Sequence, residues 1–333
     1  MFRSFLLGAL ALASVASAVT PQTVKAEWTL PQTQFLGFTD TGDLVTRGMG
    51  AVTLNVLDAA TGQARRTVVF PEVTSGRDFW GITFTPDLKT WAWVNERGDA
   101  VTVRTPQGEW TTPPASGVQY VRRLSLSPDG KALAISNANG YTQLWDTATR
   151  TRRHTLMLMR DPLAFSPDSK TLAATGIYGK SGVRLWDVPT GEKRLDLPQV
   201  ETIPRPFQFL PDGTLLTGDS RIRLDLSKMN QGDFGVSISF FPRYTEACPQ
   251  GIPWKSCVRG VWNGSVNSDA SLFLFDILRT PQNLTSSLLY DKYGKLLKIL
   301  NLPQSSNFPT LTPDAKRLIW QSNQGELLGA KVP

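Results

Sequence analysis

The side chains that commonly carry out chemistry in enzymes are sparse in this chain. Histidine occurs once, at His154, directly after Arg152 and Arg153. A Ser-His-Asp triad would have to use this residue, yet the sequence has no G-x-S-x-G elbow to present a nucleophilic serine. It also has no P-loop or Rossmann glycine pattern. We therefore expect His154 to be an ordinary exposed residue and expect no hydrolytic triad.

Two cysteines, Cys248 and Cys257, lie nine positions apart. A metal site would need further Cys or His ligands, and only one histidine exists, so we expect neither a metal nor a cofactor. An even number of closely spaced cysteines in an exported chain predicts a loop-closing disulfide. The alternative is two free thiols.

Arginines recur a few residues ahead of a repeated phrase described below. Guanidinium groups that converge at one place suit the recognition of carboxylates or phosphates. The alternative is that they pair locally with acidic neighbours such as Asp78 and Asp161 on a solvated rim. The set comprises Arg77, Arg122, Arg123, Arg160, Arg205 and Arg259.

A second candidate binding segment surrounds the cysteines, at residues 231–258. It is rich in tyrosine, tryptophan and basic residues, the types that dominate binding hot spots, and loops on a rigid scaffold often carry function. The alternative is a lid that only covers a gap in the fold. The candidate contact residues are Arg243, Tyr244, Trp254 and Lys255.

The repeated phrase is an apolar strand, a Ser/Thr-Pro-Asp-Gly-like turn and a second apolar strand. A capping hydroxyl, a proline that pre-sets φ, an aspartate and a glycine are close to ideal for a type I turn, so each copy predicts a hairpin. Acidic residues that recur in every repeat are most economically structural. Seven copies are anchored at Thr41, Asp87, Asp129, Asp168, Asp212, Asp269 and Asp314.

The spacing of these anchors predicts the architecture. The intervals are 46, 42, 39, 44, 57 and 45 residues, and all but the fifth match the length of one four-stranded propeller blade. Short strands broken by turn residues favour an all-β chain. We predict a single seven-bladed β-propeller of four-stranded antiparallel blades, with residues 231–258 as an insertion between blades five and six.

The third strands of two repeats end in a second phrase, Gln143-Leu144-Trp145-Asp146 and Arg184-Leu185-Trp186-Asp187. At these points the chain resembles the WD40-repeat family of β-propellers, although it lacks the histidine that the family usually places ahead of the inner strand. The D-x-x-T-G sequences at 58–62 and 187–191 are also similar to quinoprotein-type repeats, which build eight-bladed rings. The alternative is that D-x-x-T-G merely makes a good turn between the third and outer strands.

The N-terminus predicts export and ring closure. Residues 1–18 combine a short basic start, an apolar run and an Ala-Ser-Ala site, the pattern of a cleaved signal peptide, so the propeller would occupy 19–333. The last repeat stops one strand short, and residues 24–30 precede the first repeat. We predict that they supply the outer strand of the last blade, leaving no open sheet edge there.

Charge and repeats together favour binding. The formal net charge is +7, which suits acidic partners, but no module typical of nucleic-acid binding is visible. Three basic pairs also fall at the starts of outer strands, where they could bind an acidic partner; the interpretation we favour is that they only protect the sheet edges from aggregation. The sequence thus predicts an exported, monomeric, non-enzymatic scaffold for a protein or an acidic envelope component, without a membrane span after processing; the alternative is a quinoprotein-like or other propeller enzyme. The pairs are Arg65-Arg66, Arg152-Arg153 and Lys193-Arg194.

Overall fold

The structure is a computed structural model of the chain. It describes residues 19–48, 53–69, 81–114, 120–157, 160–175, 182–197, 207–217, 220–224, 236–240, 258–279, 284–303 and 306–333. The predicted signal peptide at 1–18 lies outside these residues, as do both cysteines.

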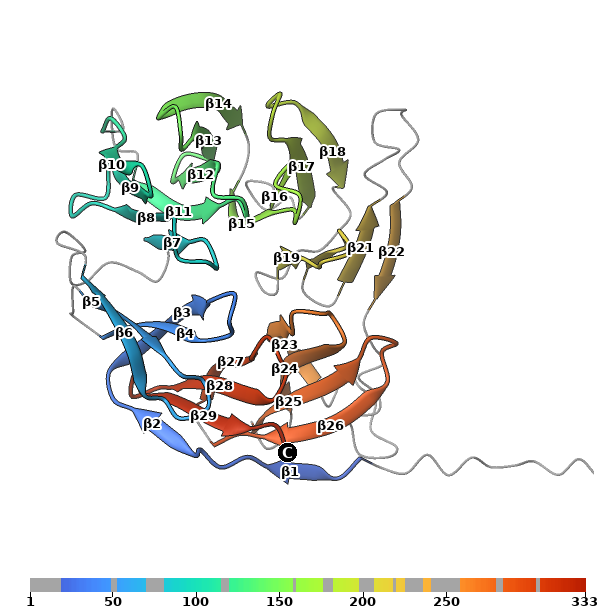
Figure 1. The fold of residues 1–333 in the computed structure, drawn as a ribbon. Helices are drawn as coiled ribbons and strands as arrows, with labels where there is room; N and C mark the ends of the chain where they lie inside the picture. Colours follow the sequence, from blue (N-terminus) through green and yellow to red (C-terminus); the bar gives the residue numbers. More distant parts are fainter. Residues whose placement is uncertain are drawn as a thin grey trace, which may run out of the picture.

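Seven antiparallel sheets stand around one axis, and the described residues contain strands and turns only (Figure 1). In each sheet the first strand of the repeat lies nearest the centre. The first four blades follow the chain in order. Blade one is β3 (Thr33–Phe38), β4 (Leu44–Gly48), β5 (Thr53–Leu57) and β6 (Ala64–Val69); blade two is β7 (Ile82–Phe84), β8 (Trp91–Val94), β9 (Val101–Thr105) and β10 (Gly108–Thr111); blade three is β11 (Val121–Leu126), β12 (Ala132–Asn137), β13 (Tyr141–Asp146) and β14 (Thr151–Met157); blade four is β15 (Arg160–Phe165), β16 (Thr171–Thr175), β17 (Val183–Asp187) and β18 (Lys193–Leu197).

The last three blades complete the ring. The interval 231–258 contains the outer strand of blade five, β22, and the rest of it, up to residue 257, lies outside the described residues. Blade five is β19 (Phe207–Phe209), β20 (Leu215–Thr217), β21 (Ser220–Leu224) and β22 (Val236–Phe240); blade six is β23 (Val258–Val266), β24 (Leu272–Arg279), β25 (Leu284–Asp291) and β26 (Leu296–Asn301), joined by β1 (Pro21–Thr23); blade seven is β27 (Ser306–Leu311), β28 (Arg317–Ser322) and β29 (Leu327–Lys331), joined by β2 (Trp28–Leu30).

The hydrophobic core lies between neighbouring blades. Both faces of a middle strand are covered, so strands such as β12 and β16 are buried along their whole length. Leu144 of blade three packs with Leu163 and Leu172 of blade four. Trp91 and Trp93 of blade two point to the same face of their strand. They pack with Val45 and Leu54 of blade one. The blades are therefore joined by apolar seams.

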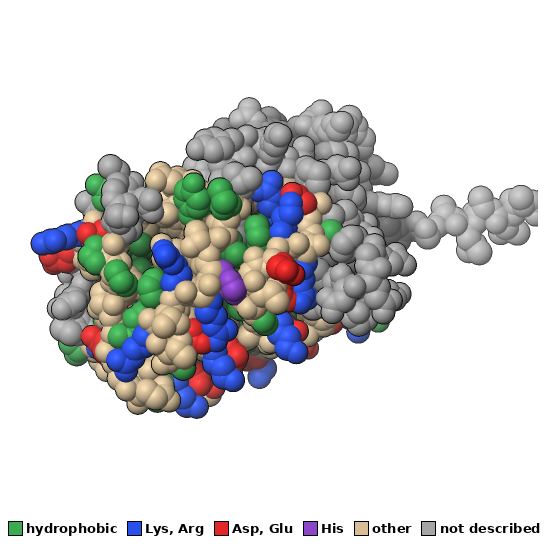
Figure 2. Space-filling view, turned by 90° about the horizontal axis from the view of Figure 1, so that it is seen from above, with side chains coloured by type: hydrophobic (Ala, Val, Ile, Leu, Met, Phe, Trp, Pro, Cys, Tyr) green, Lys and Arg blue, Asp and Glu red, His purple; other side chains and the backbone are tan. Residues whose placement is uncertain are grey.

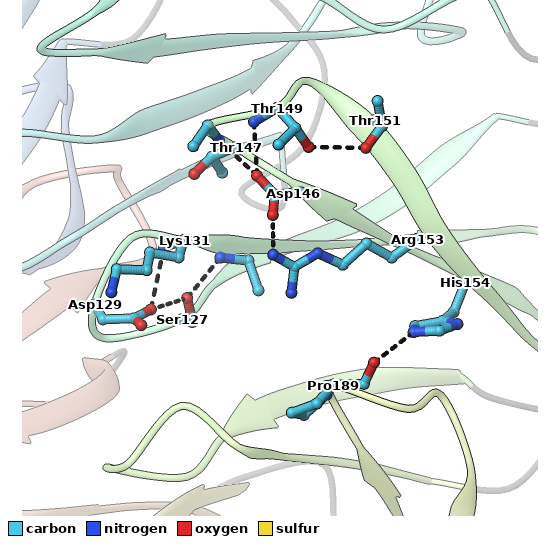
Figure 3. A network of polar contacts seen from close by, with 12 residues as sticks. Ser127, Asp129, Lys131, Asp146, Thr147, Thr149, Thr151, Arg153, His154 and Pro189 are labelled. Atoms are coloured by element: carbon cyan, nitrogen blue, oxygen red, sulfur yellow. Dashed lines mark hydrogen bonds and ion pairs between the residues drawn. The ribbon is translucent and has the colours of Figure 1, made fainter.

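The repeated turn forms as the sequence predicts. In blade three the Ser127 hydroxyl donates to Asp129 Oδ1 at 2.6 Å and accepts the Ala132 amide at 2.9 Å, while Asp129 Oδ1 accepts the Lys131 amide at 3.1 Å (Figure 3). One residue type differs from expectation. The position after the aspartate has positive φ in all seven copies, yet only three copies have glycine there: the residues are Gly42, Leu88, Gly130, Ser169, Gly213, Ala270 and Ala315.

The turns also fix how neighbouring blades meet. The amide of Asp129 donates to Ser169 Oγ in the next turn at 3.2 Å, and the amide of Asp40 donates to the Pro86 carbonyl at 2.9 Å. A third contact of this kind joins blades six and seven, where the amide of Ser268 donates to the Pro313 carbonyl at 3.0 Å. Neighbouring inner strands whose turns meet in this way run in the same direction. The turns therefore gather at one end of the ring, here called the turn end, and the starts of the inner strands gather at the other, here called the arginine end.

Acid should weaken this turn framework. The Thr85 hydroxyl lowers the pKa of Asp87, and the Arg65 guanidinium lowers the pKa of Asp58. A carboxyl whose pKa is lower in the folded state stabilises the fold above its unfolded pKa, near 4, and that stability is lost as the pH falls through the folded pKa. We expect the melting temperature to fall on acidification below about pH 4.

The contribution of these two carboxyls is measured with a D58N/D87N variant. It should be less stable than the wild type at neutral pH and should lose less stability on acidification, so that the two melting curves converge at low pH. If the melting temperatures of both proteins fell equally with pH, the stabilising role assigned to Asp58 and Asp87 would be contradicted. A D40N variant, whose side chain is exposed at the same end of the ring, controls for the loss of a surface charge.

Residues 19–30, here called the strap, close the ring along its outer edge (Figure 1). As predicted, β2 pairs antiparallel with β29 and completes blade seven. The pairing strand is shorter than expected, Trp28–Leu30, because residues ahead of it lie on blade six instead: β1 pairs parallel with β26 as a fifth strand. Val24 is 3% exposed in the seam between blades six and seven.

The strap holds two further seams. Val19 packs against the cluster shared by blades five and six. Trp28 packs near Leu44 and Leu57 of blade one. Glu27 Oε2 accepts a hydrogen bond from Arg317 Nη1 at 2.7 Å, which lowers the pKa of Glu27. Apolar side chains of the strap thus reach three consecutive seams.

Candidate functional site

The acidic groups of the turn end are engaged in structural contacts. Asp146, which closes the third strand of blade three, accepts the amides of Ala148 and Thr149 on Oδ1 and pairs with Arg153 through Oδ2 (Figure 3). The same arrangement joins the first aspartate of D-x-x-T-G to the residue seven positions later in two other blades. The pairs are Asp58–Arg65 and Asp187–Arg194.

These ion pairs support the structural interpretation of the basic residues at the outer strands. One member of each predicted basic pair neutralises an aspartate of its own blade, so these residues do not form a row of cations held ready for a partner. Figure 2 shows the outer edge of blades three and four, where Lys and Arg side chains surround the single histidine and acidic side chains lie among them. The edge is a mixed, locally paired surface, which also disfavours sheet-to-sheet aggregation.

His154 has a structural position that the sequence did not predict. It is half-buried rather than exposed, and its Nε2 hydrogen-bonds the Pro189 carbonyl of blade four at 2.9 Å (Figure 3). A Cβ added to Gly191 would lie 2.5 Å from His154 Cγ. Trp28 of blade seven lies in the same way over Gly62 of blade one. The imidazole of His154 and the indole of Trp28 thus each pack on the glycine of a D-x-x-T-G turn in the next blade.

A groove of about 860 Å³ opens at the turn end beside blades seven and one. Its charges are paired locally: Arg65 Nε lies 3.2 Å from Asp43 Oδ1, and Lys316 Nζ lies 3.6 Å from Asp314 Oδ2. Both signs of charge line it. The groove therefore has no consistent charge with which to select a partner.

The arginine end carries the predicted basic residues that the structure describes. Arg122 is exposed at a bulge in β11, and Arg123 points into the lining of the central channel. Arg160 is the first residue of β15 and Arg259 the second of β23. The other candidates lie outside the described residues: Arg77, Arg205, Arg243, Tyr244, Trp254, Lys255, Cys248 and Cys257.

The central channel holds a cavity of about 450 Å³. It is lined mainly by the inner strands of blades one, two, three and seven, and also by Ile319, Trp320, Gln321 and Leu327 of β28 and β29. The small and hydroxyl-bearing residues of the lining are Gly37, Thr83, Ser125 and Thr310. Phe35, Arg123 and Phe308 line the same cavity.

This cavity was missed by the sequence analysis, although the signal was present. The turns were located correctly, and the inner strands that lead into them supply most of the lining. Among the lining residues that the structure describes, Arg123 is the one charged side chain. Phe308 is 45% exposed there.

The comparisons with known proteins agree on the fold. No protein-family model matches the chain, and no curated protein is detectably similar in sequence. The β-propeller domain of Cps50 (Swd1) from Myceliophteria thermophila superposes with a TM-score of 0.67 at 12% identity, covering 93% of this chain and all of that domain. Hydrazine synthase from Kuenenia stuttgartiensis superposes with a TM-score of 0.60 at 13% identity, covering 91% of this chain and 95% of that one.

The seven sheets, their closure by the strap and these likenesses define the chain as a seven-bladed β-propeller. Identities this low establish the fold alone. Membership of the WD40 family therefore stays a prediction from the Trp-Asp endings. No helix able to cross a membrane occurs among the residues that were described.

Proposed function

We propose that this propeller is an exported, monomeric, non-enzymatic scaffold that binds a protein or an acidic envelope component at its arginine end. The observation that carries the proposal is the excess of arginine at the starts of the inner strands. The sequences of the seven inner strands contain four arginines and one aspartate, all within the first half of their strands. At the opposite end the repeated aspartates stand beside lysines, and Lys89 and Lys316 pair with two of them.

The contacts of those aspartates favour binding over catalysis. A catalytic acid or base must lie within reach of a substrate and must be able to give it or take from it a proton. Here the turn carboxylates accept hydrogen bonds from the hydroxyls and amides of their own turn, and the carboxylates at 58, 146 and 187 are paired with arginines. The D-x-x-T-G segments form capped turns on which an aromatic ring of the preceding blade packs, which supports a structural role for this motif over a quinoprotein one.

The proposal is tested with fluorescently labelled polyglutamate as a defined acidic probe and fluorescence anisotropy as the readout. An R122Q/R160Q variant removes two positive charges from the arginine end and should weaken binding by about tenfold. The control variant K89Q/K316Q removes two charges from the turn end, where the side chains are 71% and 80% exposed. It should bind as the wild type does.

A protein partner is sought in parallel by recovery from envelope extract. R122Q/R160Q and a W254A/R259A variant should recover less of any partner than the wild type and K89Q/K316Q do. Equal loss in both double-charge variants would show only a response to net charge, and equal recovery by all four proteins would overturn the choice of the arginine end. Visible absorbance from a bound quinone in purified protein would favour the enzyme alternative.

A further inference from the structure

We propose that the central channel is a binding site for a small molecule with an aromatic body and one carboxylate, held by Arg123, Phe35 and Phe308, which line the same cavity. This site goes beyond the proposed scaffold role, because its occupant sits inside the ring rather than on its end. Arg122 belongs to the exposed arginine end, whereas Arg123, the next residue, belongs to the cavity. The two functions can therefore be separated by neighbouring substitutions.

The lining of the cavity supplies the chemistry. Phe35, Arg123 and Phe308 line it from blades one, three and seven, and Phe35 also packs on the apolar seam between blades seven and one. A guanidinium group offers parallel N–H donors to a carboxylate, and aromatic rings offer flat apolar contact. The hydroxyls of Thr83, Ser125 and Thr310 also line the cavity and can bond further polar atoms of the ligand. The Thr310 hydroxyl donates to the Phe308 carbonyl at 3.1 Å and so offers the ligand only its acceptor lone pair.

Phe308 is an independent sign of function. Its φ is 52°, in the left-handed region that a bulky side chain rarely adopts, and the strand register shifts between Asn307 and Thr310. Elsewhere in the described chain, non-glycine residues with such a φ lie in turns, most of which a hydrogen-bonded aspartate stabilises, whereas Phe308 lies within a strand. Backbone strain of this kind is concentrated at active and binding sites. Here it holds a ring that is 45% exposed in the lining of the cavity, where burial alone does not explain it.

The size and charge of the cavity limit the ligand. A volume of about 450 Å³ lies within the range of small-molecule pockets. One cation in the described lining favours one anionic group, because a second carboxylate would be desolvated without a charged partner. Lysine, aspartate and glutamate are missing from that described lining. A monocarboxylate with a fused or extended aromatic body meets these conditions.

The probes are 2-naphthoate and its neutral analogue 2-naphthamide, with binding measured by isothermal titration calorimetry. The wild type should bind naphthoate at one site and naphthamide at least about tenfold more weakly, since only the acid bonds the guanidinium as an ion. R123Q should weaken naphthoate by about tenfold and abolish the preference for the acid. R122Q should bind both probes as the wild type does.

A second variant keeps the test valid if R123Q is unstable. F308G removes the ring and relieves the left-handed strain, so its melting temperature should equal or exceed that of the wild type while both probes bind more weakly. Absence of naphthoate binding to the wild type, equal binding of acid and amide, or undiminished binding by F308G would each overturn the proposal. If R122Q/R160Q loses polyglutamate binding and retains naphthoate binding, the channel proposal is supported. If R122Q/R160Q retains polyglutamate binding and loses naphthoate binding, the channel proposal is refuted and the scaffold proposal is not.

Discussion

Replacing Gly329 with alanine should lower the free energy of unfolding by about 3 kcal/mol. This value lies within the range for substitutions that overpack a well-packed apolar core. A Cβ at this position would lie 2.1 Å from Cζ2 of Trp28, well inside van der Waals contact. The clashing atom belongs to a large ring in the strap, so the alanine would displace the ring from the seam between blades seven and one. The change is measured by chemical denaturation.

A double-mutant cycle separates the ring contact from other effects of the substitution. W28A alone should destabilise the protein, because it empties part of the seam. In the W28A background, G329A should cost nothing or stabilise by about 0.5 kcal/mol, since glycine within a strand is itself unfavourable. An equal loss in both backgrounds would show that Trp28 does not close the ring in the described manner.

Gly191 to alanine should cost about 3 kcal/mol, whereas Gly294 to alanine should cost about 1 kcal/mol. Both glycines have positive φ, 73° and 84°, so the backbone penalty is shared. Nothing lies within 4 Å of a Cβ on Gly294, while a Cβ on Gly191 would lie 2.5 Å from His154 Cγ. The difference between the two variants therefore measures the contact between blades three and four.

His154 provides the control for this second cycle. In an H154A background the cost of G191A should fall to that of G294A, because only the left-handed backbone remains to be strained. If G191A and G294A destabilise the wild type equally, the histidine is a surface residue as first expected from the sequence. Thermal or chemical denaturation of the four proteins gives the answer.

The sequence predicts the ring well because the repeat is local. The Ser/Thr-Pro-Asp turn is set by hydrogen bonds among neighbouring residues, so the seven hairpins could be predicted directly. The closing outer strand was predicted within 24–30, and the structure confines it to Trp28–Leu30. The parallel pairing of Pro21–Thr23 with blade six could not be predicted, since three exposed residues carry no pattern of burial. The packing of the His154 imidazole on Gly191 could not be predicted for a related reason, because this contact joins residues of different blades.

The candidate sites were predicted to a smaller extent. The arginines ahead of the turns were recognised by type, and the structure places Arg122 and Arg123 on different surfaces because strand residues alternate in direction. The phenylalanines of the channel look like ordinary core residues in sequence. Only the structure shows that Phe35, Arg123 and Phe308 line the same cavity.

The salt dependence of polyglutamate binding tests the scaffold role most directly. A slope of log affinity against log salt concentration counts the charged contacts made with a polyanion. The slope should shrink by about two in R122Q/R160Q, one for each lost contact, and stay at the wild-type value in K89Q/K316Q. The same shrinkage in both variants, or in neither, would contradict binding at the arginine end.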